Sequence, residues 1–192
     1  MFRLSRMAAV AIAIFFFASC AGTNFVRPET GSIALKRTTY QDIINQFGKP
    51  YREGTRLKNE DMIKTITYAY SSVGGTALYK GVTPARAMAF HFLDDILVGY
   101  EFTSSFKEDN SDFDDSKIPL IREGVTTRDE VVTLLGEPEG IYTYPLIEGR
   151  DNEALVYMYN QFKQYKIYQK VLIVSMNDDT VAGLDYTTAG NK

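Results

Sequence analysis

The sequence predicts an α+β protein with two tandem domains, each with short helices packed on a three-stranded antiparallel β-meander. Two observations predict this fold class. One motif occurs twice, as TTYQDIINQFGKP beginning at Thr38 and as TTRDEVVTLLGEP beginning at Thr126. Each copy precedes stretches in which apolar and polar residues alternate as they do in half-buried strands. Because the copies align without a gap, they indicate one structural unit present twice.

The motif contains the start, the apolar face and the end of a short helix. In the second copy Thr126 or Thr127 is the expected N-cap, and with Thr127 as the cap Glu130 completes a capping box. Val131, Leu134 and Leu135 share one face of the helix, because they lie at positions i, i+3 and i+4. The Gly-Glu-Pro sequence that follows ends the helix. The first copy has the same pattern.

The chain opens with the features of a secretory signal peptide over residues 1–19. Two arginines precede an apolar run that is too short for an ordinary membrane span. The run ends in Phe-Ala-Ser followed by Cys20, the only cysteine, and this resembles the lipobox of bacterial lipoproteins. The resemblance implies cleavage before Cys20 and acylation of its thiol and new amino group with fatty acids such as palmitate. Ala21 resembles the enterobacterial pattern for sorting to the outer membrane.

Residues 20–30 are short and polar, and they predict a tether between the membrane and the fold. The first domain is expected over residues 31–105. The charged residues 51–61 are expected to form a loop, and the glycine-rich residues 71–84 a long connection. The three strands of this domain are expected at residues 62–70, 86–93 and 96–103.

Residues 106–117 are the most polar stretch and predict an acidic linker between the domains. The second domain is expected over residues 118–192. Its three strands are expected at residues 154–160, 165–176 and 180–187. Asp94-Asp95 and Asp178-Asp179 are expected in the last hairpin turns of the two domains, because aspartate favours turn geometry.

The charge and cysteine content exclude some classes of function. Removal of residues 1–19 takes two arginines from 21 basic residues and leaves 24 acidic ones, so the mature chain is acidic. This balance predicts no nucleic-acid partner. A secreted chain with one cysteine has no internal disulfide, so its stability must come from its core. Thirteen tyrosines and twelve phenylalanines can supply that core.

The sequence predicts no catalytic residue, metal site, cofactor or small-molecule substrate. His91 is the only histidine, and because it alternates with Phe90 and Phe92 it is expected on the opposite strand face, structural or solvent-exposed. An EF-hand loop beginning at Asp112 would have lysine where glycine is required, so the acidic run is expected to be solvated. Neither a glycine-rich phosphate loop nor a G-x-S-x-G elbow occurs in the sequence.

Aromatic and basic residues interleave between Gln161 and Lys170. Tyr165 and Tyr168 are the candidate partner surface, because exposed tyrosines suit interfaces. Such a surface would contact phospholipid headgroups, peptidoglycan or a protein. The alternative is an ordinary hairpin with tyrosine on one face and lysine on the other.

The second copy, read from Gly124 as G-x-T-T-x-x-x-V-x-x-x-L-G-x-P, resembles the signature of the SmpA/OmlA, or BamE-like, family of outer-membrane lipoproteins. The resemblance implies a domain of two short helices on a three-stranded antiparallel sheet. The type member is an accessory subunit of the machinery that inserts β-barrels into the outer membrane. Related folds include the repeats of a secreted β-lactamase inhibitor, in which two tandem copies form a concave protein-binding sheet. The first copy departs from the signature, with Lys36 in place of glycine.

Together these features predict a non-enzymatic lipoprotein, anchored in the bacterial outer membrane through Cys20 and facing the periplasm. Its expected role is that of an envelope assembly accessory or scaffold that binds an unidentified envelope protein. The alternative is an inhibitor or sensor that binds a periplasmic or secreted enzyme through a concave two-domain sheet. A third hypothesis is a cryptic hydrolase that uses Asp95 or Asp179.

Overall fold

A computed structural model describes residues 22–29 and 31–190, and it contains one antiparallel sheet of nine strands with few short helices. The predicted signal peptide and Cys20 lie outside the described residues. The strands are β1 (Arg52–Lys58), β2 (Asp61–Ser71), β3 (Val82–Thr83), β4 (Ala85–Leu93), β5 (Ile96–Ser104), β6 (Gly140–Thr143), β7 (Glu153–Lys163), β8 (Lys166–Asn177) and β9 (Thr180–Gly190). The helices are α2 (Tyr40–Phe47), the 3₁₀-helix η2 (Asp115–Leu120) and α3 (Arg128–Leu135).

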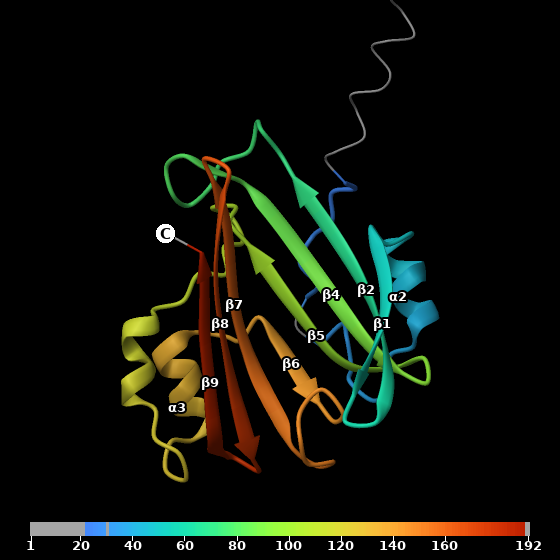
Figure 1. The fold of residues 1–192 in the computed structure, drawn as a ribbon, viewed down its shortest axis with the longest axis vertical. Helices are drawn as coiled ribbons and strands as arrows, with labels where there is room; N and C mark the ends of the chain where they lie inside the picture. The colour runs from blue at the N-terminus through green and yellow to red at the C-terminus, as the bar shows by residue number, and fades with distance from the viewer. Residues whose placement is uncertain (1–21, 30, 191–192) are drawn as a thin grey trace, which may run out of the picture.

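The sheet runs without a break from β1 at one edge to β9 at the other. Its strand order is β1-β2-β4-β5-β6-β7-β8-β9, and β3 pairs separately with β7 (Figure 1). The short strand β6 joins the two halves because it pairs with both β5 and β7. The predicted antiparallel strands are therefore present, and they form one shared sheet. The predicted short helices are present as well. The division into domains at residues 31–105 and 118–192 stays a prediction.

Strand β1 corrects the prediction of a loop over residues 51–61. All seven residues of β1 are exposed, so the segment lacks the apolar alternation that marks a strand. It nevertheless pairs with β2 along its full length, from Arg52 opposite Thr67 to Lys58 opposite Asp61. The turn consists of Asn59 and Glu60, both of which have positive φ angles.

Both motif copies form the capped helix that the sequence predicts. In α2 the side chain of Thr39 accepts a hydrogen bond from the backbone N–H of Asp42, whose carboxylate accepts one from the Thr39 N–H. Thr127 and Glu130 form the same reciprocal pair at α3, which confirms the predicted capping box. The glycine that follows each helix has a positive φ angle, 74° in the first copy and 88° in the second.

The residue two positions before each Thr-Thr pair has a left-handed backbone. Gly124 has a φ angle of 70°, and its N–H donates to the Val181 carbonyl at 2.7 Å. Lys36 has a φ angle of 61°, and its N–H donates to the Leu97 carbonyl at 2.8 Å. Lys36 therefore departs from the family signature in residue type but adopts the backbone of glycine.

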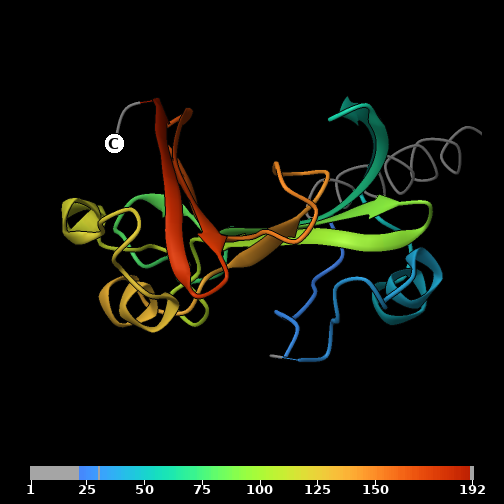
Figure 2. The ribbon, with the colours of Figure 1, turned by 90° about the horizontal axis from the view of Figure 1, so that it is seen from below.

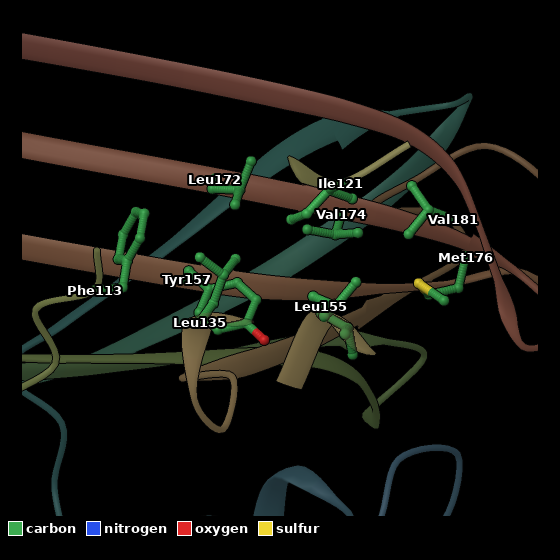
Figure 3. Packing of buried hydrophobic residues seen from close by; sticks show 10 residues of the cluster. Phe113, Ile121, Leu135, Leu155, Tyr157, Leu172, Val174, Met176 and Val181 are labelled. Carbon is green, nitrogen blue, oxygen red and sulfur yellow. The ribbon is translucent and has the colours of Figure 1, made fainter. Parts of the chain in front are cut away.

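The two larger hydrophobic cores of the described residues lie on the same side of the sheet, one under each helix. The first core packs Ile43 of α2 on Phe90 and Phe102 of the sheet. The second core packs α3 on strands β7, β8 and β9, and Figure 3 shows Leu135 beside Tyr157 in this core. The aromatic and β-branched residues of the predicted strands therefore provide the stabilising burial.

Residues 106–117 pack on the sheet. The prediction of a solvated linker is therefore wrong for this segment. Phe113 is buried in the second core. Lys170 of β8 is 1% exposed, and its Nζ lies 2.7 Å from Asp112 and 3.2 Å from Asp115. Nζ also donates to the backbone carbonyl of Phe113. The acidic side chains therefore neutralise a buried cation, which would be costly to leave unpaired.

A second buried cation binds the start of the same segment. The guanidinium of Arg86 on β4 lies 2.7 Å from Glu108 and 3.0 Å from Asp109. It also lies over the ring of Phe106, 4.3 Å from its centroid. One short acidic segment therefore supplies the counter-ions of two buried cations, one from each half of the sheet.

Residues 22–29, predicted as part of a tether, also pack on the fold. Phe25 is buried in the first core and contacts the ring of Tyr68 at a centroid distance of 6.3 Å. Arg27 forms an ion pair of 2.8 Å with Glu139, which precedes β6. The polar composition of the segment does not indicate these two contacts, so the sequence did not predict that the segment packs on the fold.

The sheet has one covered face and one open face. Figure 2 shows α2 and α3 on the same side of the sheet, while β1 and the β8–β9 hairpin rise on the other side. We call the side away from both helices the open face. The sheet curves around this face, so the open face is concave. Within residues 22–29 and 31–190, no helix has the length and apolar character that a membrane span requires.

Candidate functional site

A groove of about 540 Å³ crosses the open face. Strands from both halves of the sheet line it, namely β2, β4 and β5 from the first half and β7 and β8 from the second. Concave sites of this size are typical of binding surfaces. The groove is the candidate functional site.

The floor of the groove consists of small side chains. Ala69, Ala87 and Thr103 lie side by side on β2, β4 and β5, since Ala87 pairs with both of the others. Ala85 extends this floor along β4. Small side chains allow the backbone of a binding partner to approach the sheet closely.

The two sides of the groove differ in chemistry. Phe162 on β7 and Ile167 on β8 pair with each other and form an exposed apolar wall. On the far side, the groove is lined by Tyr51, which directly precedes β1. Beyond the groove lining, Arg52 and Arg56 of β1 pair with β2 residues of the open face, and residues that face each other in antiparallel strands project from the same side. No salt bridge occupies either arginine within the described part of the chain.

A chain of polar side chains crosses the open face next to the groove. Thr65 Oγ1 lies 2.8 Å from His91 Nδ1, and His91 Nε2 lies 2.7 Å from Glu101 Oε2. The ring of Tyr142 packs edge-on against His91 with a centroid distance of 5.6 Å. Burial raises the pKa of Tyr142 far above its usual range, and the carboxylate of Glu101 adds to the effect.

This polar chain contains the residue types of a hydroxyl–imidazole–carboxylate triad. Both ring nitrogens of His91 have partners, and the residue is 3% exposed under Tyr142. The sequence predicted His91 on the strand face opposite Phe90 and Phe92. In the structure His91 lies on that face and is buried. With both nitrogens occupied, the imidazole joins β2, β4 and β5 and is held in one orientation.

The structure separates the two tyrosines predicted to form a partner surface. Tyr165 is 95% exposed in the turn between β7 and β8. Tyr168 is buried on the covered face, on the same side of β8 as Lys170 and Leu172. Tyr165 therefore has the exposure expected of a partner surface, whereas Tyr168 lacks it because the alternation of β8 points this side chain toward the covered face. A partner surface at Tyr165 stays a prediction.

The acidic residues considered for metal binding or hydrolysis have structural roles, through their carboxylates in residues 112–115 and through their backbone carbonyls at Asp95 and Asp179. Asp112 and Asp115 bind Lys170, and Asp114 caps η2. The backbone carbonyls of Asp95 and Asp179 accept hydrogen bonds from the first residues of α2 and α3, at 2.9 and 3.0 Å. Among the described residues, no group of three or more histidine, cysteine or acidic side chains is placed to hold a metal ion.

Glu139 is an acidic side chain whose pKa the fold raises into the neutral range. It is buried beside β6, and burial raises its pKa from 4.5 to about 7, although the nearby Arg27 opposes the shift. The carboxyl therefore changes charge near neutral pH. It lies on the covered face, away from the groove, so it concerns stability.

The sequence contains a pattern that indicates the small side chains of the groove floor. In ARAMAF, residues 85–90, alanine alternates with arginine, methionine and phenylalanine. Such alternation places the large residues on one face and leaves a smooth strip of alanine on the other. The alternation of basic residues in β1 is a similar signal, but the absence of apolar residues obscured the strand.

Comparison with known proteins adds a fold-level likeness. No family model and no curated protein matches this chain. The structure is similar to that of a "putative beta-lactamase inhibitor protein" from Streptococcus mutans, with a TM-score of 0.42 and 12% sequence identity. The similarity covers 78% of this chain and 82% of the other. The resemblance of the motif to the SmpA/OmlA family stays an expectation.

Proposed function

We propose that the protein is a non-enzymatic lipoprotein of the bacterial outer membrane that binds a protein partner in the groove of its open face. The single observation that carries this proposal is the groove itself, with its floor of small side chains between Phe162 and Ile167 on one side and Tyr51 on the other. The lipid anchor at Cys20 and the periplasmic location are parts of the proposal that rest on the lipobox-like sequence.

The chemistry of the groove suits a protruding loop of a folded protein. Apolar side chains of the loop would pack on Phe162 and Ile167, and its backbone would approach Ala87 closely. The side-chain oxygen of Asn160, at the groove wall, is buried without a hydrogen-bond partner among the described residues. A donor from the loop would satisfy this acceptor, which otherwise has an energetic cost.

A role as an inhibitor or sensor of a periplasmic or secreted enzyme fits this groove better than the scaffold role. A scaffold or assembly accessory can bind through any exposed surface. An inhibitor must receive or cover a particular element of its target, and a concave face does so with a large complementary area. We further infer that the two helix–sheet halves are two copies of one unit, because their caps, left-handed residues and buried cations correspond.

Site-specific photo-cross-linking in living cells tests the proposal. A photoreactive amino acid replaces Gln169, which lines the groove, and in a matched strain it replaces Leu120, which is exposed on η2. We expect a discrete protein adduct from position 169 and none from position 120. The adduct would then be identified, purified and assayed for inhibition if it is an enzyme.

A groove-filling variant provides the second arm of the test. Ala87→Trp fills the floor of the groove, and Ala182→Trp adds the same side chain at an exposed position of β9. We expect the first variant alone to weaken binding of the identified partner by roughly tenfold or more. Equal binding by both variants, or adducts only from position 120, would refute a partner site in the groove.

A further inference from the structure

The two most exposed large apolar side chains of the described residues lie at one end of the sheet. Val73 is 99% exposed in the connection from β2 to β3, and Tyr165 in the β7–β8 turn is nearly as exposed. Ile167, next to that turn, is 65% exposed. Figure 1 shows the connection after β2 and the β7–β8 hairpin together at the upper end of the molecule. Large exposed apolar side chains grouped at one end of a molecule indicate an interaction site.

Pairing between strands makes this surface one unit. The short strand β3 pairs with the end of β7, so Val82 faces Lys163 and Thr83 faces Phe162. The connection after β2 is thereby held beside the β7–β8 hairpin. We call the exposed side chains here that do not line the groove the hairpin end, namely Val73, Lys80, Lys163, Tyr165 and Lys166.

The hairpin end combines its apolar side chains with positive charge. Lys80, Lys163 and Lys166 are exposed. Within the ranges that the structure describes, none of these three lysines takes part in a salt bridge. Aromatic rings and lysines together suit the interfacial region of a bilayer, where the rings lie at headgroup level and the ammonium groups meet phosphates.

The described chain begins at the same end. Gly22 packs so tightly on β2 that an added Cβ would lie 2.0 Å from the carbonyl oxygen of Ala69. Ala69 lies near the end of β2, two residues before the connection that carries Val73. Cys20, the proposed acylation site, precedes Gly22 by two residues. A lipid anchor would therefore start beside the hairpin end.

We infer that the hairpin end lies on the phospholipid bilayer and acts with the lipid anchor as a second membrane contact. Its orientation rests on the anchor of the proposed function. An acylated Cys20 would hold the chain at the membrane through one point and leave its orientation free, so an apolar and basic protein surface beside it would supply a second point of contact. The contact also fixes the orientation of the molecule, with β1–β2 and their turn pointing away from the membrane.

Tryptophan fluorescence tests this inference directly, because the chain contains no tryptophan. Tyr165→Trp places a single reporter at the hairpin end. Leu57→Trp places the matched control beside the β1–β2 turn at the other end of the molecule, where Leu57 is 67% exposed. Each full-length protein is purified from membranes and reconstituted in vesicles of phosphatidylethanolamine and phosphatidylglycerol with brominated acyl chains. We expect quenching and a blue shift at position 165 and neither at position 57.

The acyl content of each sample, measured by mass spectrometry, separates this inference from the proposed function. Quenching at position 165 without an acyl chain would support the membrane surface and refute the anchor. An acylated, vesicle-bound protein with no quenching at position 165 would refute the membrane surface, keep the anchor and indicate a protein partner for the hairpin end. Equal quenching at both positions would also overturn the inference, because it would show no fixed orientation.

Discussion

Lys36 shows that a single residue can keep the geometry of a motif while losing its residue type. A lysine at a φ angle of 61° pays a steric cost that glycine avoids. Its N–H nevertheless donates to Leu97, just as the Gly124 N–H donates to Val181. The hydrogen bond therefore holds the lysine in a conformation that the side chain disfavours.

We predict that Lys36→Gly raises the free energy of unfolding by about 0.5 to 1 kcal/mol, since relief of strain outweighs the greater freedom of glycine in the unfolded chain. Urea denaturation measures the change. Gly124→Ala is the control, and it should lower stability by about 1 kcal/mol. A destabilised Lys36→Gly protein would contradict this account of the site.

Glu139 makes stability depend on pH. Its folded-state pKa of about 7 lies above the ordinary value of 4.5, so the folded protein retains a proton that the unfolded chain has released. Stability from this group is therefore greatest below about pH 4.5 and falls as the pH rises toward 7, by up to about 3 kcal/mol. We predict that Glu139→Gln removes this decline. Denaturation at pH 5 and pH 8 measures it, and an unchanged difference between wild type and variant at the two pH values would argue against the shifted pKa.

At the scale of elements, the acidic segment of residues 106–117 connects the two halves of the sheet, because it forms ion pairs with Arg86 of the first half and Lys170 of the second. We predict that Lys170→Met lowers the free energy of unfolding by about 3 to 5 kcal/mol, because Asp112 and Asp115 would lose the cation that neutralises them. Lys166→Met, an exposed lysine on the same strand, should change stability by less than about 0.5 kcal/mol. Thermal and urea denaturation compare the two variants, and equal effects would show that the buried ion pairs contribute little.

The sequence predicted those elements whose signals are local. Helices α2 and α3 have their caps and apolar faces within a few residues, and β2, β4, β7, β8 and β9 have clear alternation. Strand β1 was missed because an edge strand with every residue exposed shows no apolar pattern. The packing of the acidic segment was missed because it depends on Lys170, whose burial arises from strands distant in sequence. The groove needed the same long-range information, although the alanines of β4 were visible.

At the scale of the whole molecule, the fold separates three surfaces. Helices and both cores occupy the covered face, the open face carries the groove, and the hairpin end carries exposed apolar and basic side chains. Phe162 and Ile167 of the groove wall lie next to the hairpin end, beside the β7–β8 turn. A partner in the groove would therefore be bound beside the proposed membrane contact.

The lipid anchor is the prediction that concerns the molecule as a whole. We expect Cys20→Ala to abolish incorporation of a fatty-acid analogue in cells, because it removes the only thiol. Ala21→Ser, one residue further on, should keep the label. Incorporation is measured by gel fluorescence after click labelling and immunoprecipitation. Unchanged labelling of Cys20→Ala would refute the lipobox interpretation.

The shared acidic segment also determines where the chain can be cut. A fragment that begins at residue 118, the boundary that composition suggests, would keep Lys170 but lose Asp112 and Asp115. A fragment that ends at residue 105 would keep Arg86 and lose Glu108 and Asp109. Each half would then bury a charge without its counter-ion. Either half by itself would therefore be less stable than the same residues in the intact chain.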